Sequence, residues 1–417
     1  MTARWRTVRL LLAIEAGSLV LAGCANRPAL TAQEPRRAPV VVGYLASWGV
    51  RSKGTRIAEL PGDRLTHVIY AFARIGADGR LALGDVCLDL GECEGRSGQG
   101  GVGPGGNFAQ LRILKQRHPH LRLLIAVGGW TGSGRFSDVA LTAESRRAFA
   151  ESALDVVIRG HRGLFDGIDV DWEYPVGGGL QGNAARPEDR RNFTLLLEEL
   201  RRQLDAQGAR EGRRYLLTAA TAAGPSHVAN LELDRVAALL DWFNVMTYDY
   251  HAGSRETHFN EPLYAAAGDP TPQLNVDATV RLYLDRGVPA RKIVLGVPFY
   301  GRSYGRVPRT NRGLFQAAGG PAPREWGAGE LDFDTLLRKR PEANGFRRHW
   351  EPIARVPWLY NDSTGTWITY DDVQSIGQKA DYAHARGLLG VMAWELGGDD
   401  DGRLVRTIHA RLSVRGR

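Results

Sequence analysis

The chain has 417 residues, of which 43% are hydrophobic and 24% charged, as in an ordinary globular protein with one large domain and an insertion, or with two domains. The formal net charge is +8, and arginine far outnumbers lysine. These arginines are interspersed with acidic residues along predicted helices and form no long basic run, which argues against nucleic acid as a partner.

Residues 1–23 have the pattern of an export signal. Basic residues precede a short apolar run at 10–21, which is too short for a comfortable membrane span. Residues 21–24 (Leu-Ala-Gly-Cys) resemble a bacterial lipoprotein cleavage box, in which Cys24 becomes the lipidated first residue. We therefore expect an exported, membrane-anchored lipoprotein on the periplasmic or cell-surface side, or alternatively a secreted protein. Residues 24–39 would form its tether.

The chain contains three cysteines. If Cys24 is lipidated, Cys87 and Cys93 remain as an even set in an oxidising compartment, which predicts a small disulfide in a loop. The alternative is two free thiols. Two cysteines without a nearby histidine do not indicate a metal site.

From residue 40 onward, apolar strand patterns alternate with loops and amphipathic helices. The predicted strands are 40–47, 65–75, 121–127, 165–173, 215–221, 242–248, 292–299 and 388–395. Helical spacing is clearest at 145–159 and 187–207. Eight strand–helix units with nearly continuous apolar strands favour an α/β fold, a parallel (β/α)8 TIM barrel, although the count also suits an open doubly wound sheet. The first strand is not followed by Gly-x-Gly-x-x-Gly, so a dinucleotide cofactor has no support.

The fourth strand carries an unusual row of acids. Asp169, Asp171 and Glu173 alternate with apolar residues and therefore share one face, whereas Trp172 faces away and is predicted to be core, as is Trp242. Acids near the carboxyl end of a central strand indicate a site in parallel α/β folds. Like charges this close cannot all ionise freely, so at least one pKa should rise, and a carboxylic acid protonated near neutral pH is a general acid.

The same stretch resembles the signature of family 18 glycoside hydrolases, the chitinases and their relatives. The family pattern Asp-x-x-Asp-x-Asp-x-Glu is filled here by Asp166, Asp169, Asp171 and Glu173. The resemblance implies Glu173 as general acid and base. It implies that Asp171 orients the N-acetyl group of the substrate, whose carbonyl oxygen is the nucleophile, and that Asp169 tunes Asp171 through a shared proton. No metal or cofactor is implied.

Other strand ends extend the resemblance. Residues 246–249 (Met-Thr-Tyr-Asp) resemble the family's Met-x-Tyr-Asp, in which the tyrosine, here Tyr248, holds the acetamido group. In isolation, Tyr248 would be read as a barrel-core tyrosine with a satisfied hydroxyl. The substrate-binding positions implied by the resemblance are Tyr44, Phe72, Gly128, Gly129, Trp130, Tyr174, Met246, Asp249, Arg302 and Trp394. Non-proline cis peptide bonds are implied before Phe72, Tyr174 and Glu395.

One position departs from the family pattern. Ala126 stands where the family has a serine, whose hydroxyl supports the middle aspartate, here Asp169. Asp169 must therefore find another partner, or share a proton more tightly with Asp171.

Roughly eighty residues separate the seventh and eighth strands, where a handful is usual. This stretch is rich in aromatic residues and resembles the small α+β insertion domain of many chitinases. The predicted domains are thus a barrel of residues 40–304 and 367–417, and an insertion of residues 305–366 that forms one wall of a deep cleft.

The sequence therefore predicts a chitinase that hydrolyses β-1,4 bonds between N-acetylglucosamine units with retention of configuration. Chitin or chito-oligosaccharides are the expected partner, together with the membrane through Cys24, and a monomer is expected. Two alternatives stay open. One is a non-catalytic chitin-binding lectin on the same barrel. The other is a hydrolase of a different N-acetylglucosamine glycan, such as peptidoglycan, spore wall or N-glycan.

Overall fold

The computed structural model describes residues 1–2, 38–93 and 105–413. Most of the predicted signal, Cys24 and most of the predicted tether lie outside these residues. Among the helices of the described ranges, none combines the length and the apolar character needed to span a membrane.

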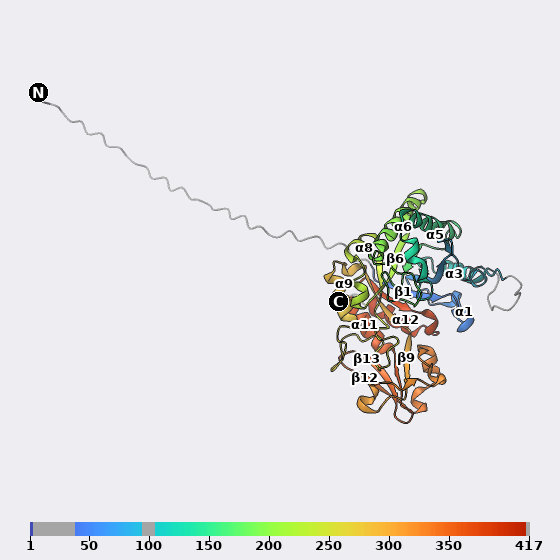
Figure 1. The fold of residues 1–417 in the computed structure, drawn as a ribbon, viewed down its shortest axis with the longest axis vertical. Helices are drawn as coiled ribbons and strands as arrows, with labels where there is room; N and C mark the ends of the chain where they lie inside the picture. Colours follow the sequence, from blue (N-terminus) through green and yellow to red (C-terminus); the bar gives the residue numbers. More distant parts are fainter. Residues whose placement is uncertain (3–37, 94–104, 414–417) are drawn as a thin grey trace. The chain divides into compact units, whose positions relative to one another are not determined.

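Within the described residues, eight parallel strands close into a barrel (Figure 1). They are β1 (Val40–Ala46), β2 (His67–Ile75), β4 (Arg122–Gly128), β5 (Gly167–Asp171), β6 (Leu216–Ala222), β7 (Trp242–Met246), β8 (Ile293–Pro298) and β15 (Gly390–Trp394). The first strand pairs with both β2 and β15, so the sheet has no free edge. The predicted (β/α)8 barrel is confirmed, and the open sheet is excluded. A short strand, β3 (Leu81–Ala82), pairs antiparallel to β2.

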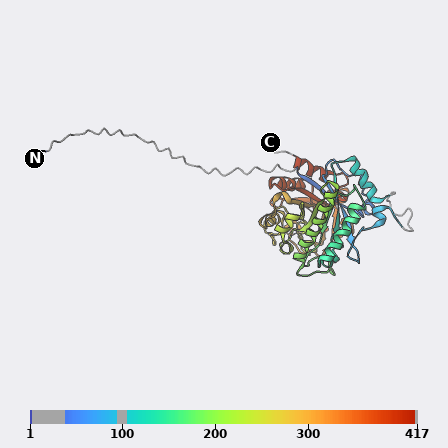
Figure 2. The same ribbon diagram turned by 90° about the horizontal axis from the view of Figure 1, so that it is seen from above.

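Helices cover the outside of the barrel (Figures 1 and 2). The longer ones are α3 (Gly106–Arg117), α5 (Ala143–Ala153), α6 (Asp189–Glu211), α8 (Leu233–Leu239), α9 (Val276–Asp285), α11 (Val373–Ala385) and α12 (Arg403–Ser413). The short ones are α1 (Gly49–Ser52), α2 (Val86–Leu90), α4 (Phe136–Val139), α7 (Pro225–Val228) and α10 (Phe333–Arg338). The helix predicted at 145–159 is α5, which continues as a π-helix over Leu154–Arg159.

The strand alternation divides the apolar residues into two cores. Side chains on one face of each strand fill the barrel interior, where Tyr44, Ile69, Leu124, Trp242 and Met392 pack together. Side chains on the other face pack against the helices and form the larger core. The site residues on β5 share the interior with the first set.

A second sheet lies between β8 and β15 in the chain, and its strands gather at one end of the domain in Figure 1. Its six strands within the described residues are β9 (Tyr300–Gly305), β10 (Gly320–Pro321), β11 (Glu330–Asp332), β12 (Phe346–Glu351), β13 (Val356–Asn361) and β14 (Thr366–Thr369). Because β9 begins before residue 305 and β14 ends after residue 366, the sheet extends beyond the predicted insertion 305–366 at both ends. It has its own aromatic core around Trp358, Tyr360 and Trp367.

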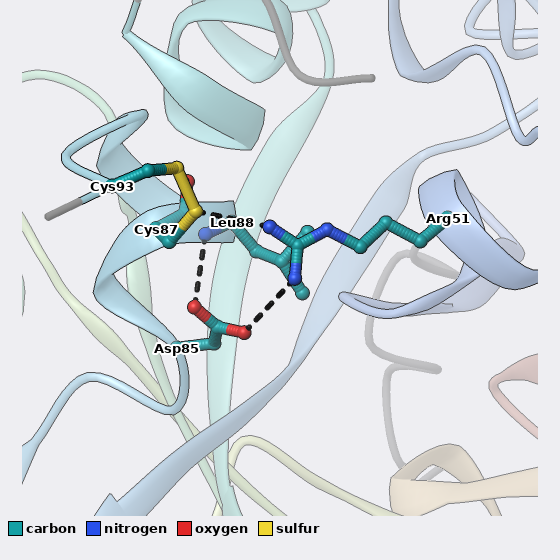
Figure 3. Close-up of a disulfide and its surroundings, with 5 residues drawn as sticks. All are labelled: Arg51, Asp85, Cys87, Leu88 and Cys93. Carbon is teal, nitrogen blue, oxygen red and sulfur yellow. Dashed lines mark hydrogen bonds and ion pairs between the residues drawn. A yellow bond between two sulfur atoms is a disulfide. The ribbon is translucent and has the colours of Figure 1, made fainter. Parts of the chain in front are cut away.

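A disulfide joins Cys87, in α2, to Cys93 (Figure 3). Asp85 caps α2 by accepting the backbone N–H of Leu88 at 3.1 Å. The guanidinium of Arg51, in α1, lies 2.9 Å from Cys87 Sγ and 3.6 Å from the Asp85 carboxylate. These contacts tie the turn after β1 to the segment that follows β3.

Candidate active site

Two of the three predicted acids lie at the end of β5, inside the barrel. Asp169 and Asp171 are buried, whereas the alternate residues Ile168 and Val170 belong to the outer core. Trp172 stacks on Phe136 in that outer core, with ring centroids 5.3 Å apart, as predicted for a residue that faces away from the acids.

Glu173 lies beyond the strand, because β5 ends at Asp171 rather than at Glu173. The carbonyl oxygen of Asp171 accepts the N–H of Gly129 at 2.8 Å and the hydroxyl of Ser133 at 3.1 Å. The N–H of Glu173 in turn donates to Ser133 Oγ at 2.9 Å. The backbone therefore leaves the sheet here, and Ser133 fixes where the Glu173 side chain begins.

Gly128 and Gly129 have no room for a side chain. Both have positive φ, at 110° and 77°. A Cβ at Gly128 would lie 2.1 Å from the Asp171 carbonyl oxygen, and one at Gly129 would lie 2.5 Å from the Phe72 ring. The glycine pair thus lets the end of β4 pass close to Asp171.

Asp169 is held by donors from three other strands. Its Oδ2 accepts the hydroxyl of Tyr44 at 2.8 Å, and its Oδ1 accepts Thr218 Oγ1 at 2.5 Å and Asn244 Nδ2 at 3.1 Å. Ala126 pairs with Asp169 in the sheet register and offers no hydroxyl. Asp169 was expected to need another hydrogen-bond partner in place of the serine, and it has three. Burial raises the pKa of Asp169 to about 6, and the three hydrogen bonds limit that rise.

Asp171 is the least satisfied acid of the group. Its Oδ1 is buried and has no hydrogen-bond partner among the described residues. Burial raises the pKa of Asp171 well above its usual range, and the charges of Glu173 and Asp169 raise it further. Burial and the two acidic neighbours both favour the protonated form of Asp171.

Glu173 has the pKa expected of a general acid. Burial raises its pKa to about 7, the charge of Asp249 adds to the rise, and a hydrogen bond from Tyr174 opposes it. A carboxyl group with this pKa is populated in both protonation states near neutral pH, so it can give and then take a proton.

Tyr248 and its neighbours come from the end of β7. Burial and then the charge of Asp171 raise the pKa of Tyr248 well above its usual range, so its hydroxyl stays a donor at neutral pH. Asp249 has a positive φ of 59° and pairs with Arg302, whose Nε and Nη2 lie 2.8 and 2.6 Å from its Oδ1. Met246 is partly buried in the barrel interior.

Aromatic rings line the approach to the acids. Phe72 stacks on Trp394 at 5.7 Å and on Trp48 at 6.3 Å, and Tyr44 packs against Trp394 at 5.6 Å. Trp130 is 47% exposed and Trp48 is 43% exposed, which is unusual for tryptophan. Open aromatic faces of this kind suit the apolar face of a sugar ring.

A cavity of about 270 Å³ adjoins this aromatic row. It is lined by Trp48, Lys53, Tyr300, Glu330, Leu331, Asp332, Trp394 and Glu395. Lys53 Nζ lies 2.8 Å from Asp332, at the end of β11, and 2.5 Å from Glu395, just after β15. The lysine thus connects the second sheet to the barrel.

Several residues of the site were missed by sequence reasoning. Trp48 directly follows the first strand region, and an aromatic residue at that place is the signal that could have found it. Thr218 and Asn244 are polar residues inside largely apolar strands, a weaker signal of the same kind. Nothing in the local sequence marks Ser133 or Lys53.

The cis peptide bonds implied by the resemblance are present at all three places, before Phe72, Tyr174 and Glu395. No group of three or more His, Cys, Asp or Glu side chains in ranges 38–93 and 105–413 is arranged to hold a metal ion. The site thus brings together a carboxyl group with a pKa of about 7, a buried acid beside it, a tyrosine hydroxyl and a set of aromatic rings.

Comparisons with known proteins agree with this geometry. Residues 40–399 match the pattern of the family described as glycosyl hydrolases family 18. Chitinase A1 of Niallia circulans is 41% identical over 415 residues, covering 90% of this chain and 59% of that protein. The chain thus spans less than two thirds of this relative's length.

Two solved structures are also similar. A chitinase from Bacillus thuringiensis has a TM-score of 0.82 and 34% identity, with 91% of this chain and 71% of that chain covered. A Paenibacillus chitinase, described as cell-surface-expressed, has a TM-score of 0.80 and 38% identity over 90% of this chain and 33% of that one. From its sequence match and its barrel, this chain belongs to family 18 of the glycosyl hydrolases.

Proposed function

We propose that the protein is a chitinase that cleaves β-1,4 bonds between N-acetylglucosamine units with retention of configuration. The observation that carries this proposal is the pairing of Glu173, with a pKa of about 7, with the buried and unpartnered carboxyl of Asp171. The names of the similar proteins, which are chitinases, support the same substrate.

In the first step, protonated Glu173 gives its proton to the glycosidic oxygen as the bond from that oxygen to the anomeric carbon breaks. The carbonyl oxygen of the substrate's own acetamide attacks the same carbon and forms an oxazolinium ring. Asp171 holds the acetamide N–H, and its unpartnered Oδ1 is free to accept that hydrogen bond. Tyr248 donates to the acetamide from the other strand end.

In the second step, Glu173, now a carboxylate, takes a proton from water. The resulting oxygen nucleophile attacks the anomeric carbon from the face that the leaving group vacated, and the oxazolinium ring opens. Two inversions at one carbon give net retention. Asp169 supports Asp171 through its charge and its place one step behind it on β5.

A second carboxylate on the opposite face of the sugar is not needed in this scheme. Asp169 and Asp171 lie on the same face of β5, and Glu173 stands two residues after Asp171, just beyond the strand. This arrangement favours the acetamide as nucleophile over a carboxylate pair that flanks the bond.

Hydrolysis of fully N-acetylated chitohexaose tests the proposal, with wild-type protein, the Glu173→Gln variant and fully deacetylated hexaose as control. We expect cleavage by the wild type alone, and of the acetylated chain alone. Binding without cleavage by the wild type would favour the lectin, and cleavage of peptidoglycan or N-glycan alone would favour the other alternative. Cleavage of the deacetylated chain would exclude the acetamide as obligatory nucleophile.

We also propose that the protein is exported, anchored through a lipid on Cys24, and active as a monomer. The cleavage box at 21–24 supports the anchor, and the assembly of all proposed catalytic side chains from one chain supports the monomer. Detergent phase partitioning should place the wild type in the detergent phase and a Cys24→Ala variant in the aqueous phase. Sedimentation velocity of the protein checks the monomer.

A further inference from the structure

Tyr174 directly follows the proposed acid and stands between two side chains. On one side its hydroxyl hydrogen-bonds to the Glu173 carboxylate and lowers the pKa of that group. On the other side its ring packs against the imidazole of His227, with centroids 4.5 Å apart and planes tilted by 47°. His227 has no part in the proton transfers described above.

His227 lies on α7 (Pro225–Val228), just beyond the carboxyl end of β6. Its imidazole hydrogen-bonds to the backbone of Gly178, in the loop that follows Tyr174. This loop is tightly packed. A Cβ at Gly178 would lie 2.3 Å from His227 Nε2, and one at Gly179 would lie 1.9 Å from the carbonyl oxygen of Glu173. The loop is thus packed between the imidazole and the backbone of the acid.

A small apolar space adjoins the Tyr174 and His227 rings. The cavity holds about 10 Å³ and is lined by Trp172, Tyr174, Pro175, Phe193, Ala220, Thr221, Ala222, His227 and Leu231. A smaller side chain at position 227 would enlarge this space, which is lined by Tyr174 and not by Glu173. The tyrosine ring would then have a position available in which its hydroxyl no longer reaches the carboxylate.

We propose that His227 is a positioning residue, which holds the Tyr174 ring and the loop at Gly178 so that the Tyr174 hydroxyl stays on Glu173. This inference rests on the proposed role of Glu173 as the acid. His227 touches neither substrate nor reacting atoms in this scheme and acts only through Tyr174.

Release of Tyr174 should change the pKa of Glu173 in one direction. The titratable groups that act on Glu173 are Tyr174, Asp249 and the coupled Asp171. Of these, Tyr174 stabilises the ionised carboxylate by donating a hydrogen bond, and loss of that bond raises the pKa of Glu173. A variant that releases Tyr174 should therefore move the basic limb of the pH–activity curve to higher pH, and direct removal of the Tyr174 hydroxyl should do the same.

The test compares His227→Ala, Tyr174→Phe and the double variant. The first readout is the titration of the Glu173 carboxyl by carbon-13 NMR, with the signal assigned by Glu173→Gln. The second is the pH dependence of kcat/KM on chitohexaose. We expect both single variants to raise the Glu173 midpoint by about half a pH unit or more, and the double variant to raise it no further than Tyr174→Phe.

Two further variants separate the parts of the His227 side chain. His227→Phe keeps the ring contact and should leave the midpoint near that of the wild type. His227→Gln keeps hydrogen-bonding groups but lacks the ring, and should shift the midpoint even if His227→Ala does not fold. An unshifted midpoint in His227→Gln and His227→Ala, or additive shifts in the double variant, would overturn the proposal. The NMR titration needs no turnover, so it remains decisive if the chitinase proposal itself fails.

Discussion

The hydroxyl of Tyr44 donates to Oδ2 of Asp169 at 2.8 Å across 125 positions of sequence, joining β1 to β5 inside the barrel. Thr218 on β6 and Asn244 on β7 donate to the other oxygen of the same carboxylate. Asn244 is itself oriented by Trp242, whose Nε1 donates to its Oδ1 at 2.9 Å. Asp169 is therefore fixed by neighbours on both sides of the barrel interior, which replaces the serine absent at Ala126.

Thr218→Val should move the acid limb of the pH–activity curve upward. The substitution keeps the shape but removes a donor to the ionised form of Asp169, whose pKa of about 6 then rises. We expect kcat at pH 6 to fall about tenfold, and less at pH 7, where more of Asp169 remains ionised. Thr218→Ser retains the hydroxyl and should behave like the wild type. An equal loss at every pH would contradict this role.

Asp249→Asn should move the basic limb downward. The general acid must be protonated, so activity falls as pH rises through the Glu173 pKa of about 7. The negative charge of Asp249 contributes to the raised pKa of Glu173, and its removal lowers it. Profiles of kcat/KM in wild type and variant measure the shift. Asp332→Asn, which removes a carboxylate paired with Lys53, serves as a matched control and should leave the basic limb in place. A basic limb that moves to higher pH in Asp249→Asn would show that Asp249 does not raise the pKa of Glu173.

Trp48→Ala should weaken binding of long chains more than short ones. Trp48 is 43% exposed and stacks on Phe72, which in turn stacks on Trp394. Loss of one aromatic stacking contact costs about 1–1.5 kcal/mol, or roughly tenfold in KM. Comparison of hexaose with triose substrates checks this. Equal increases in KM for both lengths would show that Trp48 acts on the site as a whole.

Lys379→Met should destabilise the fold. Lys379 Nζ lies 2.7 Å from Glu261 and forms a second ion pair with Asp371, and none of the three side chains is more than 1% exposed. Removal of the cation leaves two buried carboxyl groups unpaired, and breaking such a pair typically costs about 3–5 kcal/mol of unfolding free energy. Denaturant unfolding measures the change, with Arg56→Met as a surface control, because the Arg56 side chain is 77% exposed.

The same cluster gives stability a pH dependence. Burial raises the pKa of Glu261 well above its usual range, against the opposing effect of Lys379. A group with a raised folded-state pKa contributes stability at low pH, and this contribution is lost as pH rises through the folded value. Glu261→Gln should therefore flatten the decline of unfolding free energy with rising pH. If the unfolding free energy of Glu261→Gln falls with rising pH as steeply as that of the wild type, other groups cause the decline.

The alternation of polar and apolar residues in the sequence predicted much of the barrel and the placement of its acids. The alternation of Asp169 and Asp171 with Ile168 and Val170 predicted which side chains enter the interior, and the structure confirms that division. The predicted strand 165–173 was two residues too long at each end, because β5 runs only from Gly167 to Asp171. At the carboxyl end, the backbone N–H of Glu173 donates to Ser133, forty positions earlier, instead of to the sheet. No periodicity along β5 could report a partner on another element.

The residues that hydrogen-bond to the acids could not be predicted from the sequence for the same reason. Thr218 meets Asp169 only because β5 and β6 pair in one register, and a shift by one residue would place it on the opposite face. Lys53 meets Glu395 only because β1 and β15 are neighbours in a closed barrel. Closure itself was predicted, but the register that sets these contacts was not.

The configuration of the first product distinguishes the substrate-assisted mechanism from an inverting one. Proton NMR during early hydrolysis of N-acetylated chitohexaose, before mutarotation, reports the anomer released at the new reducing end. Attack by the acetamide followed by water through Glu173 predicts the β-anomer first, with α appearing only as the sugar equilibrates. Initial release of the α-anomer would contradict the substrate-assisted mechanism, and absence of any cleavage would contradict the chitinase.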